Sequence, residues 1–470
     1  MRLGIVIMAA GKGTRLKSKR AKVLHQIGGQ PLLRHVIASA AQVVPARDIL
    51  VVVGHQAELV QAAVRDTGVR FVEQREQRGT GHAIQCAERE TRGYEHLIVL
   101  SGDVPLLKTE TMLALRDFHV HQKAAMTILT AEPTHSFGYG RVLRRKPGKP
   151  EVAAIVEQKA LKPAQEGLRE INSGIYAFQR KPLFEHIGRL RPTNAHKELY
   201  LTDMAGMLVK AGERVVAIEA AHPTEVLGAN TIAEMMDLDR EMRLEKARAL
   251  MAAGVSIFQP ETVMIDGGVE VGPDTVIEPF AQLLGTTRIG SDCRIRSYSV
   301  LENTTLGDRV EILHSCVIED AVIEKGARLG PMAHLRPGCH IGENAHIGNF
   351  VEAKKTRVGA GSKANHLTYL GDAQVGSGTN IGAGTITCNY DGVNKYQKVI
   401  GDRVFIGSDS ALVAPVVIGE GAYIAAGSVI TDDVPADALA LGRARQVNKE
   451  HWAKNRRAQQ EARKKGSTKK

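Results

Sequence analysis

The first half of the chain alternates short apolar runs with segments that have the composition of helices. Residues 4–7, 49–54 and 96–103 are runs of mainly β-branched residues and leucine, each leading toward glycine or polar residues. Runs of this length and character are typical of the inner strands of a parallel sheet that helices cover on both faces. We therefore predict an α/β domain over residues 1–228, with its ligands bound beyond the carboxyl ends of the strands.

A polar segment rich in good helix formers follows this domain. It runs from Thr231 to about Ala253, and Gly254 after it is a natural stop for a helix. We predict a helical linker over residues 229–254 between the first domain and the rest of the chain.

Beyond residue 254 the aliphatic residues recur every six positions. Many units read aliphatic, glycine, two intervening residues and a small residue, as in 289–293, 329–333, 341–345 and 418–422, and the intervening residues are both polar in 289–293 and 341–345. A helix, with its period of 3.6 residues, cannot hold a six-residue register over so many units, whereas a parallel β-helix of hexapeptide repeats requires it. The residues that keep this register, apart from two five-residue steps and one gap, are Ile265, Val271, Ile277, Leu283, Ile289, Ile295, Leu301, Leu306, Ile312, Ile318, Ile323, Leu329, Leu335, Ile341, Ile347, Ile400, Ile406, Leu412, Ile418, Ile424 and Ile430.

Three such units make one triangular coil in which each aliphatic residue points inward and the small residue fits the corner. With coils stacked about 4.8 Å apart, residues 255–442 would form a prism of roughly nine coils, on the order of 43 Å long. A core of this kind needs no aromatic residues, which fits an aromatic content of only 4%. The register breaks between about 351 and 375 and between 387 and 399, and we expect function to reside in loops inserted at these breaks.

Composition narrows the class of protein further. The 470 residues include 43% apolar and 24% charged residues, and no stretch approaches the ~18 consecutive apolar residues of a membrane span. The N-terminal run reads as a buried strand rather than a secretion signal, so we expect a cytoplasmic protein without membrane insertion. Scattered cysteines without any CxxC pair favour reduced, packed thiols over disulfides or a zinc site: Cys86, Cys293, Cys316, Cys339 and Cys388.

The formal net charge of +11 is concentrated in a C-terminal tail. Residues 443–470 hold 11 Lys and Arg against 2 Asp and Glu, a net charge of +9, so residues 1–442 carry only +2. A terminal basic run of this kind is typically solvated and disordered. Because aromatic residues do not interleave with the basic ones, as a stacking surface for single strands requires, we expect no nucleic-acid partner.

A glycine-rich loop, Met-Ala-Ala-Gly-Lys-Gly-Thr-Arg-Leu at residues 8–16, follows the first predicted strand. Leu16 stands where a dinucleotide fingerprint needs its third glycine, and no Gly-Lys-Ser/Thr ends the loop, so neither that fingerprint nor a P-loop is present. What remains is a turn whose backbone N–H groups can approach phosphate, with positive charge from Lys12, Arg15 and Lys22. A plain tight turn between a strand and a helix is the alternative interpretation.

Two sets of motifs resemble known families. The pattern Gly-x-Gly-Thr-Arg at 11–15, with Lys-Val-Leu at 22–24, resembles the signature of sugar-phosphate nucleotidyltransferases. The segments Lys-x-x-His-Leu-Thr-Tyr-Leu-Gly-Asp at 363–372 and Asn-Tyr-Asp-Gly at 389–392 resemble the bacterial bifunctional N-acetylglucosamine-1-phosphate uridyltransferases and glucosamine-1-phosphate acetyltransferases. This resemblance covers almost the whole chain. It implies a Rossmann-like nucleotidyltransferase domain followed by a left-handed β-helix.

For the first domain the resemblance implies transfer of a uridylyl group from UTP to N-acetylglucosamine 1-phosphate, with release of pyrophosphate. Repulsion between an anionic nucleophile and a triphosphate makes up much of the barrier, so cations and in-line positioning should dominate catalysis. Arg15 and Lys22 would be the catalytic cations, and Asp103 and Asn230 would hold Mg²⁺. The resemblance implies substrate binding by Gly11, Gln74, Gly79 and Thr80, and sugar binding by Gly140, Glu157 and Asn172.

Two positions depart from this family's pattern. Ala21 stands where proline commonly precedes the lysine, and the change could loosen the backbone that presents Lys22. Lys197 stands where glycine is usual, shortly before Tyr-Leu-Thr-Asp at 200–203, so we assign no sugar contact to that segment.

For the β-helix the resemblance implies acetylation of glucosamine 1-phosphate by acetyl-CoA. An amine must be neutral to attack a thioester, so a general base that titrates near neutrality is useful, and histidine supplies one. Among 17 histidines, His366 is assigned as the catalytic base because it lies in the first register break and matches the family motif. The sugar phosphate would be bound by Arg336, Lys354, Tyr369 and Asn380, and acetyl-CoA would lie against Ala383, Asn389, Tyr390, Ser408, Ala426 and Arg443.

The resemblance also implies a homotrimer in which neighbouring chains line each acetyltransferase site, and flat prism faces suit such a closed threefold assembly. The leading hypothesis is a bifunctional transferase that makes UDP-N-acetylglucosamine for bacterial envelope polymers. One alternative is a nucleotidyltransferase whose β-helix only oligomerises or regulates it, and another is a scaffold with a vestigial nucleotide fold. Intact Arg15, Lys22, Asp103 and Asn230 speak against the scaffold, and Lys354, His366, Tyr369 and Asn389 speak against the first alternative.

Overall fold

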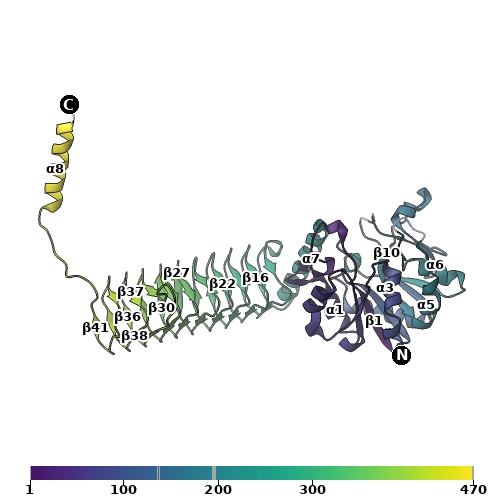
Figure 1. Ribbon diagram of the computed structural model, residues 1–470, viewed down its shortest axis with the longest axis horizontal. Coiled ribbons are helices and arrows are strands. Elements are labelled where there is room, and N and C mark those ends of the chain that lie inside the picture. The colour runs from purple at the N-terminus through teal and green to yellow at the C-terminus, as the bar shows by residue number, and fades with distance from the viewer. Residues whose placement is uncertain (1, 135, 137, 193–196, 468–470) are drawn as a thin grey trace. The chain divides into compact units, whose positions relative to one another are not determined.

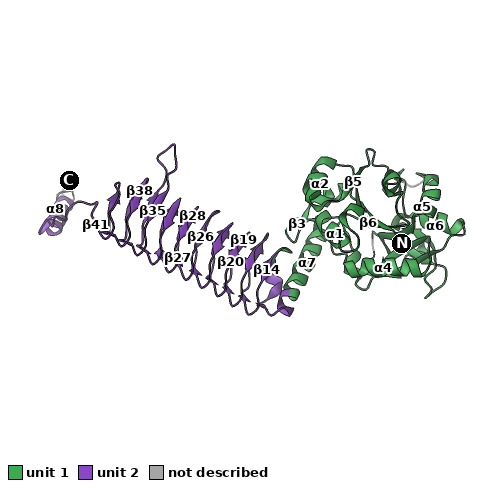
Figure 2. Cartoon of the chain, turned by 90° about the horizontal axis from the view of Figure 1, so that it is seen from below, with its two compact units in different colours: residues 1–249, 265–268 green, residues 250–264, 269–470 purple. Residues whose placement is uncertain are grey.

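The computed structural model describes residues 2–134, 136, 138–192 and 197–467, and the chain divides into two compact units. Unit 1 comprises residues 1–249 and 265–268, and unit 2 comprises residues 250–264 and 269–470 (Figure 2). The helix expected over 231–253 is α7 (Ile232–Ala252), and the division falls inside it. Gly254 follows with a φ of +94°, a conformation that favours glycine at the end of a helix.

Unit 1 is built on a sheet with the strand order β11-β7-β10-β6-β1-β4-β5. Strands β1 (Leu3–Met8), β4 (Ile49–Val53), β5 (Arg70–Glu73) and β6 (His96–Ser101) are parallel, as are β7 (Met126–Ala131) and β11 (Val215–Glu219). Strand β10 (Ile171–Gln179) is antiparallel to both β6 and β7, and β8 (Arg141–Arg144) pairs with β10 and with β9 (Val152–Val156). The predicted, mostly parallel sheet is confirmed, with one long antiparallel strand in its middle.

Helices cover both faces of this sheet. Side chains of β1 alternate between two core clusters, Ile5 and Ile7 in one and Val6 in the other. The first cluster includes residues of α1 (Leu32–Ala40), α2 (Ala57–Val64) and α4 (Thr109–His121), and the second includes residues of α3 (Thr80–Cys86), α5 (Arg180–His186) and α6 (Asp203–Lys210). Burial on both faces explains why these strands are continuously apolar in sequence.

The carboxyl ends of the central strands meet at one edge of the sheet. Met8 at the end of β1 is in register with Ser101 of β6 on one side and with Val52 of β4 on the other. The chain therefore leaves β1 at the point where successive strands are added to opposite sides, and such a switch point opens a crevice for ligands.

Unit 2 is a prism of stacked coils (Figure 1). Its three parallel sheets have 11, 10 and 9 strands, and each strand pairs with the third one after it, except that β39 pairs with β41. The strands are two to four residues long and run from β12 (Ser256–Ile257) to β41 (Leu439–Ala440). Every aliphatic residue of the six-residue register is buried except Val271, which is partly exposed. The inward-pointing register is thus confirmed. The expected number of roughly nine coils matches the 9-stranded sheet and is lower than the number of strands in the other two sheets, which have 11 and 10.

The first predicted break in the register is wrong. Between residues 351 and 375 the ladder continues through β28 (Glu352–Lys354), β29 (Arg357–Val358), β30 (Lys363–His366), β31 (Tyr369–Gly371) and β32 (Ala373–Val375). Alanine takes inward positions in these coils, as Ala353 and Ala364 show, and both are buried. Following only the large aliphatic residues hid these strands, because alanine can also take the inward position of a coil.

The second predicted break is an inserted loop. Residues 389–397 connect β34 (Ile386–Cys388) to β35 (Lys398–Ile400) and project from the prism (Figure 2). A β-bridge joins Tyr390 to Lys395, and the carboxylate of Asp391 accepts the backbone N–H groups of Val393 and Asn394 at 2.8 and 2.6 Å. These hydrogen bonds lower the pKa of Asp391 and fix the shape of the loop.

The basic tail contains a helix, where disorder was expected. Helix α8 (Trp452–Ser467) is made largely of alanine, glutamine, lysine and arginine, which have high helix propensity, and its side chains are exposed as far as residue 464. The five cysteines are free thiols, and burial raises the pKa of Cys316 to about 11. Among the described residues, no helix combines the length and hydrophobicity needed to cross a bilayer.

A buried histidine pair makes unit 1 sensitive to acid. His119 of α4 lies 2.8 Å from the hydroxyl of Thr127 and 3.1 Å from the ring of His96, and burial lowers the pKa of His119 from 6.5 to about 3. The unfolded chain therefore takes up a proton below pH 6.5 that the folded chain refuses, and stability falls by up to about 1.4 kcal/mol per pH unit as pH drops toward 3. In His119→Asn, calorimetry from pH 7 to 4 should show a shallower fall in the unfolding temperature of unit 1. An unchanged slope would contradict this origin of the acid sensitivity.

A buried lysine weakens unit 2. Lys398 shares the inward side of β35 with Ile400, its side chain is fully buried, and its Nζ has no hydrogen-bond partner among the described residues. Burial lowers its pKa, so the unfolded chain holds this proton more tightly and the cost shrinks as pH rises toward 10.5. Lys398→Met should stabilise unit 2 by about 1–3 kcal/mol near pH 7 and by less near pH 10, measured by calorimetry. The exposed Lys325 provides the control, since Lys325→Met should change little.

Candidate active sites

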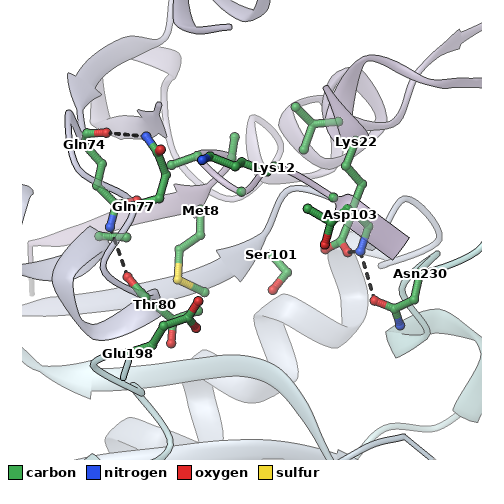
Figure 3. Close-up of a pocket in the computed structure, with 18 of the residues that line it drawn as sticks. Met8, Lys12, Lys22, Gln74, Gln77, Thr80, Ser101, Asp103, Glu198 and Asn230 are labelled. Atoms are coloured by element: carbon green, nitrogen blue, oxygen red, sulfur yellow. Dashed lines mark hydrogen bonds and ion pairs between the residues drawn. The ribbon is translucent and has the colours of Figure 1, made fainter. Parts of the chain in front are cut away.

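A cleft opens at the carboxyl edge of the sheet in unit 1. Two adjoining cavities of about 690 and 740 Å³ share Arg15, Thr80, Asp103 and Asn230 in their walls. The first also includes the glycine-rich loop and Gln74, and the second includes the predicted sugar-side residues Gly140, Glu157 and Asn172. The structure therefore brings together around one cleft all the residues that the sequence assigned to the first reaction. Figure 3 shows Lys22, Gln74, Thr80, Asp103 and Asn230 among them.

Glycine at position 13 allows the loop after β1 to pack closely. Its φ is +62°, and a Cβ there would lie 2.7 Å from the Cβ of Lys22. Lys22 begins the short 3₁₀ helix η2 (Lys22–Leu24), so this glycine lets the loop rest directly on the turn that carries the lysine. Gly11 has open space around its Cα, in which a ligand can approach the backbone.

Lys22 joins the two residues that the sequence assigned to Mg²⁺. Its Nζ forms an ion pair with Asp103 Oδ2 and donates a hydrogen bond of 3.1 Å to Asn230 Oδ1 (Figure 3). Both oxygens therefore face one point, at which a cation already lies. Asp103 follows β6 and Asn230 precedes α7, so residues far apart in sequence meet at the edge of the sheet.

A capping box at the start of α7 holds Asn230. The Glu234 carboxylate accepts the backbone N–H groups of Asn230 at 2.7 Å and of Thr231 at 3.3 Å, and the Thr231 hydroxyl accepts the N–H of Glu234. The Thr-x-x-Glu pattern of a capping box is visible in the sequence. This pattern is the sequence signal for Glu234 as a supporting residue, which sequence reasoning missed.

Among the residues predicted to bind the nucleotide, Gln74 is buried and already hydrogen-bonded. Its Nε2 donates to Gly79 O at 3.0 Å, and its backbone carbonyl accepts from Gln77 Nε2 at 3.0 Å (Figure 3). Gly79 has a φ of +104°, and a Cβ there would lie 2.7 Å from Leu199 O. Gln77 also lines the cavity, and sequence reasoning missed it.

The segment to which the sequence assigned no sugar contact lines the cavity beside the predicted sugar-binding residues. Tyr200, Leu201 and Thr202 are part of its wall, and the Thr202 hydroxyl donates to Glu157 Oε1 at 2.9 Å. Asn172 Nδ2 donates to Tyr176 OH at 2.9 Å. Lys197 has a φ of +54°, so the position tolerates lysine in the conformation that glycine adopts more easily.

The predicted base of the second reaction lies at a corner of the prism. His366 ends β30 and is in register with Asn349, which ends β27 (His346–Asn349), and its Nδ1 is 2.9 Å from Asn349 Oδ1. With the amide oxygen facing the ring, Nδ1–H is the donor and Nε2 is left with a free electron pair. The imidazole is exposed, so Nε2 can accept a proton from a ligand. Sequence reasoning missed Asn349, because its contact with His366 arises only from the register in which β27 and β30 pair.

Four of the six residues assigned to acetyl-CoA continue along this corner. The N–H of Asp409 donates to Ala383 O, and the N–H of Gly427 donates to Ser408 O, each at 2.7 Å. Arg443 lies against Gly427, with its Cδ 3.7 Å from where a Cβ would stand. Ala383, Ser408, Ala426 and Arg443 therefore follow one another down the corner in successive coils.

The phosphate-binding candidates gather at a different corner. Arg336 follows β25 (His334–Leu335) and Lys354 ends β28, and the positive charges of Lys395 and Arg336 lower the pKa of Lys354. Lys395 belongs to the inserted loop and was missed in the sequence. Three cations in one place, with Arg336 paired to Glu352 at 3.1 Å, form a site suited to an anion.

Tyr369 and Asn389 converge above Gly371 near the second corner. A Cβ at Gly371 would lie 2.6 Å from Tyr369 OH and 2.7 Å from Asn389 Nδ2, so only glycine leaves room for both side chains. Asn389 Nδ2 also donates to Asp372 Oδ2 at 2.6 Å. Tyr390 is exposed in the loop, and Asn380 in β33 (Asn380–Ile381) is partly exposed.

The second set of candidates is thus split within one chain. His366, Ala383, Ser408, Ala426 and Arg443 lie where the 11-stranded sheet turns into the 10-stranded one. Arg336 and Lys354 lie where the 10-stranded sheet turns into the 9-stranded one, and so do Asn389 and Tyr390, which the sequence had assigned to acetyl-CoA. A single face of the prism separates the two corners.

Both units contain segments that match known protein families. Residues 5–253 match the MobA-like NTP transferase domain, and residues 320–353 and 398–432 match the bacterial transferase hexapeptide family of six repeats. These matches confirm the predicted fold class, an α/β nucleotidyltransferase domain followed by a left-handed parallel β-helix.

Relatives align along nearly the whole chain. The protein called Bifunctional protein GlmU from Koribacter versatilis is 59% identical over 98% of this chain and 99% of its own length. Those of Solibacter usitatus and Pelobacter propionicus are 52% and 47% identical, over 97% and 95% of this chain and 97% of their own lengths in both cases.

The Asn349 contact predicts the tautomer of His366. In ¹⁵N-histidine-labelled protein at about pH 9, the ring should carry its hydrogen on Nδ1, because Asn349 Oδ1 accepts it. Asn349→Ala should move the ¹⁵N shifts toward the Nε2–H form that free imidazole prefers, and His366→Gln identifies the signal by its loss. Identical spectra for wild type and Asn349→Ala would contradict the assigned contact.

Proposed function

The chain belongs to the family of the bifunctional GlmU proteins, and from this we propose that unit 1 carries the uridylyl transfer and unit 2 the acetyl transfer. It is a bifunctional enzyme, a nucleotidyltransferase and an N-acetyltransferase. Glucosamine 1-phosphate is acetylated by acetyl-CoA, and N-acetylglucosamine 1-phosphate then takes a uridylyl group from UTP, giving UDP-N-acetylglucosamine and pyrophosphate.

In unit 1 the cluster of Lys22, Asp103 and Asn230 carries the proposal. A glycine-rich loop, with Arg15 beside it, lies next to this cluster in the cleft, so backbone N–H groups and two side-chain cations face the same space. Such a site suits a triphosphate, whose reaction requires charge neutralisation and in-line placement of the sugar phosphate rather than a protein nucleophile. Gln74, Gly79 and Thr80 then face the nucleotide, and Gly140, Glu157 and Asn172 face the sugar.

Asp103 and Asn230 fit a magnesium ion. A carboxylate and an amide oxygen are hard ligands, they already meet at one cation, and magnesium commonly takes only one or two side chains with phosphate oxygens and water. Magnesium bound there would neutralise charge on the phosphates.

In unit 2 the exposed Nε2 of His366 carries the proposal. It would take the proton that the amine of glucosamine 1-phosphate loses on attacking the thioester, while Asn349 keeps the ring in the required tautomer. Arg336, Lys354 and Lys395 would bind the sugar phosphate, and Tyr369, Asn380, Asn389 and Tyr390 would orient the sugar beside the acetyl group. Acetyl-CoA would lie along the corner of Ala383, Ser408, Ala426 and Arg443.

We further propose a homotrimer, in which a neighbouring copy of the chain completes each acetyltransferase site. Two observations support it. The candidate residues lie at two corners of one prism, so a corner from another chain can face each. The prism also exposes large apolar side chains, such as the register neighbours Val399 and Val417 and the stacked rings of Phe405 and Tyr423. Because UTP and acetyl-CoA are cytoplasmic metabolites, we place the enzyme in the cytoplasm.

Single substitutions should separate the two reactions. His366→Ala should lower acetyl transfer, followed as CoA thiol release, by about 10²-fold or more and leave pyrophosphate release unchanged. Asp103→Ala should lower pyrophosphate release from UTP and N-acetylglucosamine 1-phosphate by about 10²-fold or more and spare CoA release.

Each variant serves as the control for the other, since both assays run on the same preparation. Omitting glucosamine 1-phosphate, acetyl-CoA, UTP or Mg²⁺ in turn assigns each component to its reaction. Loss of both activities in either variant, with an unchanged unfolding temperature, would contradict separate sites.

A further inference from the structure

The side chain of Gln56 clamps the segment that leads into Lys22. Gln56 Oε1 accepts the backbone N–H of Ala21 at 2.7 Å, and Gln56 Nε2 donates to Lys19 O at 2.8 Å. Gln56 precedes α2, and its φ of +52° turns the chain there. The amide group of Gln56 therefore bonds both the carbonyl of Lys19 and the N–H of Ala21, and these two bonds fix the backbone between the two residues.

The segment held by Gln56 ends at Ala21, directly before η2, the turn that carries Lys22. Ala21 is buried and is the residue before η2, and its carbonyl accepts the N–H of Leu24 at 3.0 Å. Lys22 therefore leaves the backbone directly after the clamped peptide, packs its Cβ against Gly13 and reaches Asp103 with its Nζ. A shift of Ala21 would move the start of the lysine side chain, whose far end must meet the oxygens of Asp103 and Asn230.

The backbone of Ala21 explains why a clamp is useful. Its φ of −55° lies within the range that a proline ring would enforce covalently, and its ψ of 138° is one that proline also adopts. Alanine leaves φ free, so a noncovalent restraint of this segment does the same work. A proline at 21 would lack the N–H, and its Cδ would project toward Gln56 Oε1, which is only 2.7 Å from the nitrogen.

We propose that Gln56 is a positioning residue for uridylyl transfer, acting on Lys22 through the backbone of Ala21. The inference rests on the proposed role of Lys22 in unit 1. A double-mutant cycle follows from the steric argument: each single change removes or blocks the restraint, whereas the pair Gln56→Ala with Ala21→Pro restores it by covalent means.

The experiment measures pyrophosphate release and CoA release by the full-length enzyme. Gln56→Ala should lower kcat for uridylyl transfer about 5- to 10-fold, because a misplaced catalytic group loses transition-state contact. Ala21→Pro alone should lower it by a similar factor. The double variant should return to within about 2-fold of wild type, since the two defects cancel. CoA release should be unchanged in all three.

Further variants test the detail of the clamp. Gln56→Glu keeps the acceptor for Ala21 and loses the donor to Lys19, so its kcat should lie between those of wild type and Gln56→Ala. Gln61→Ala, on the same helix, is the matched control and should not change kcat. Unfolding temperatures are recorded for every variant.

The inference is overturned if Gln56→Ala lowers only the unfolding temperature, or if the double variant is as slow as the single ones. Lys22→Ala separates this failure from that of the proposed function. If Lys22→Ala leaves uridylyl transfer intact, the role of Lys22 is wrong. If it abolishes the reaction while Gln56→Ala has no effect on kcat, only the clamp is refuted.

Discussion

Parallel pairing of strands is the constraint on which both candidate sites depend. In unit 1 it brings the ends of β1, β4 and β6 to one edge, so Lys22 can meet Asp103 and Asn230, which are far from it in sequence. In unit 2 it stacks equivalent positions of successive coils, so His366 meets Asn349 and the acetyl-CoA positions form a column. In both units the chemistry lies where strands end, because there the backbone turns and side chains from several strands can converge.

Much of the fold could be predicted from period and run length, because these reflect burial directly. Large aliphatic residues at six-residue spacing identified the prism. The coils that contain Ala353 and Ala364 were not predicted, because alanine also occurs at many other positions and does not mark the repeat. The site residues matched to motifs gather as expected around the cleft in unit 1. Three further residues could not be found in this way. Asn349 meets His366 through the register of two strands, Lys395 approaches Lys354 through the shape of a loop, and Gln56 reaches Ala21 because of where α2 packs.

Two lysines illustrate how environment decides what a charge does. Lys22 lies in a cleft with a carboxylate and an amide oxygen at its ammonium group, so its charge is compensated and available to a ligand. Lys398 points into the prism, where its ammonium group has no hydrogen-bond partner among the described residues. The first arrangement is suited to function, whereas the second is tolerated because the remaining coils supply enough apolar contact to offset it.

Each coil of unit 2 contacts only the coils directly before and after it, because its strands pair with the third strand on either side. A whole coil can therefore be gained or lost during evolution between β12 and β24 (Arg328–Leu329) without disturbing His366 or the column beyond it. The length of the prism is in this sense modular. Natural selection can change the number of coils that precede the acetyltransferase residues, while the coils that contain these residues stay intact.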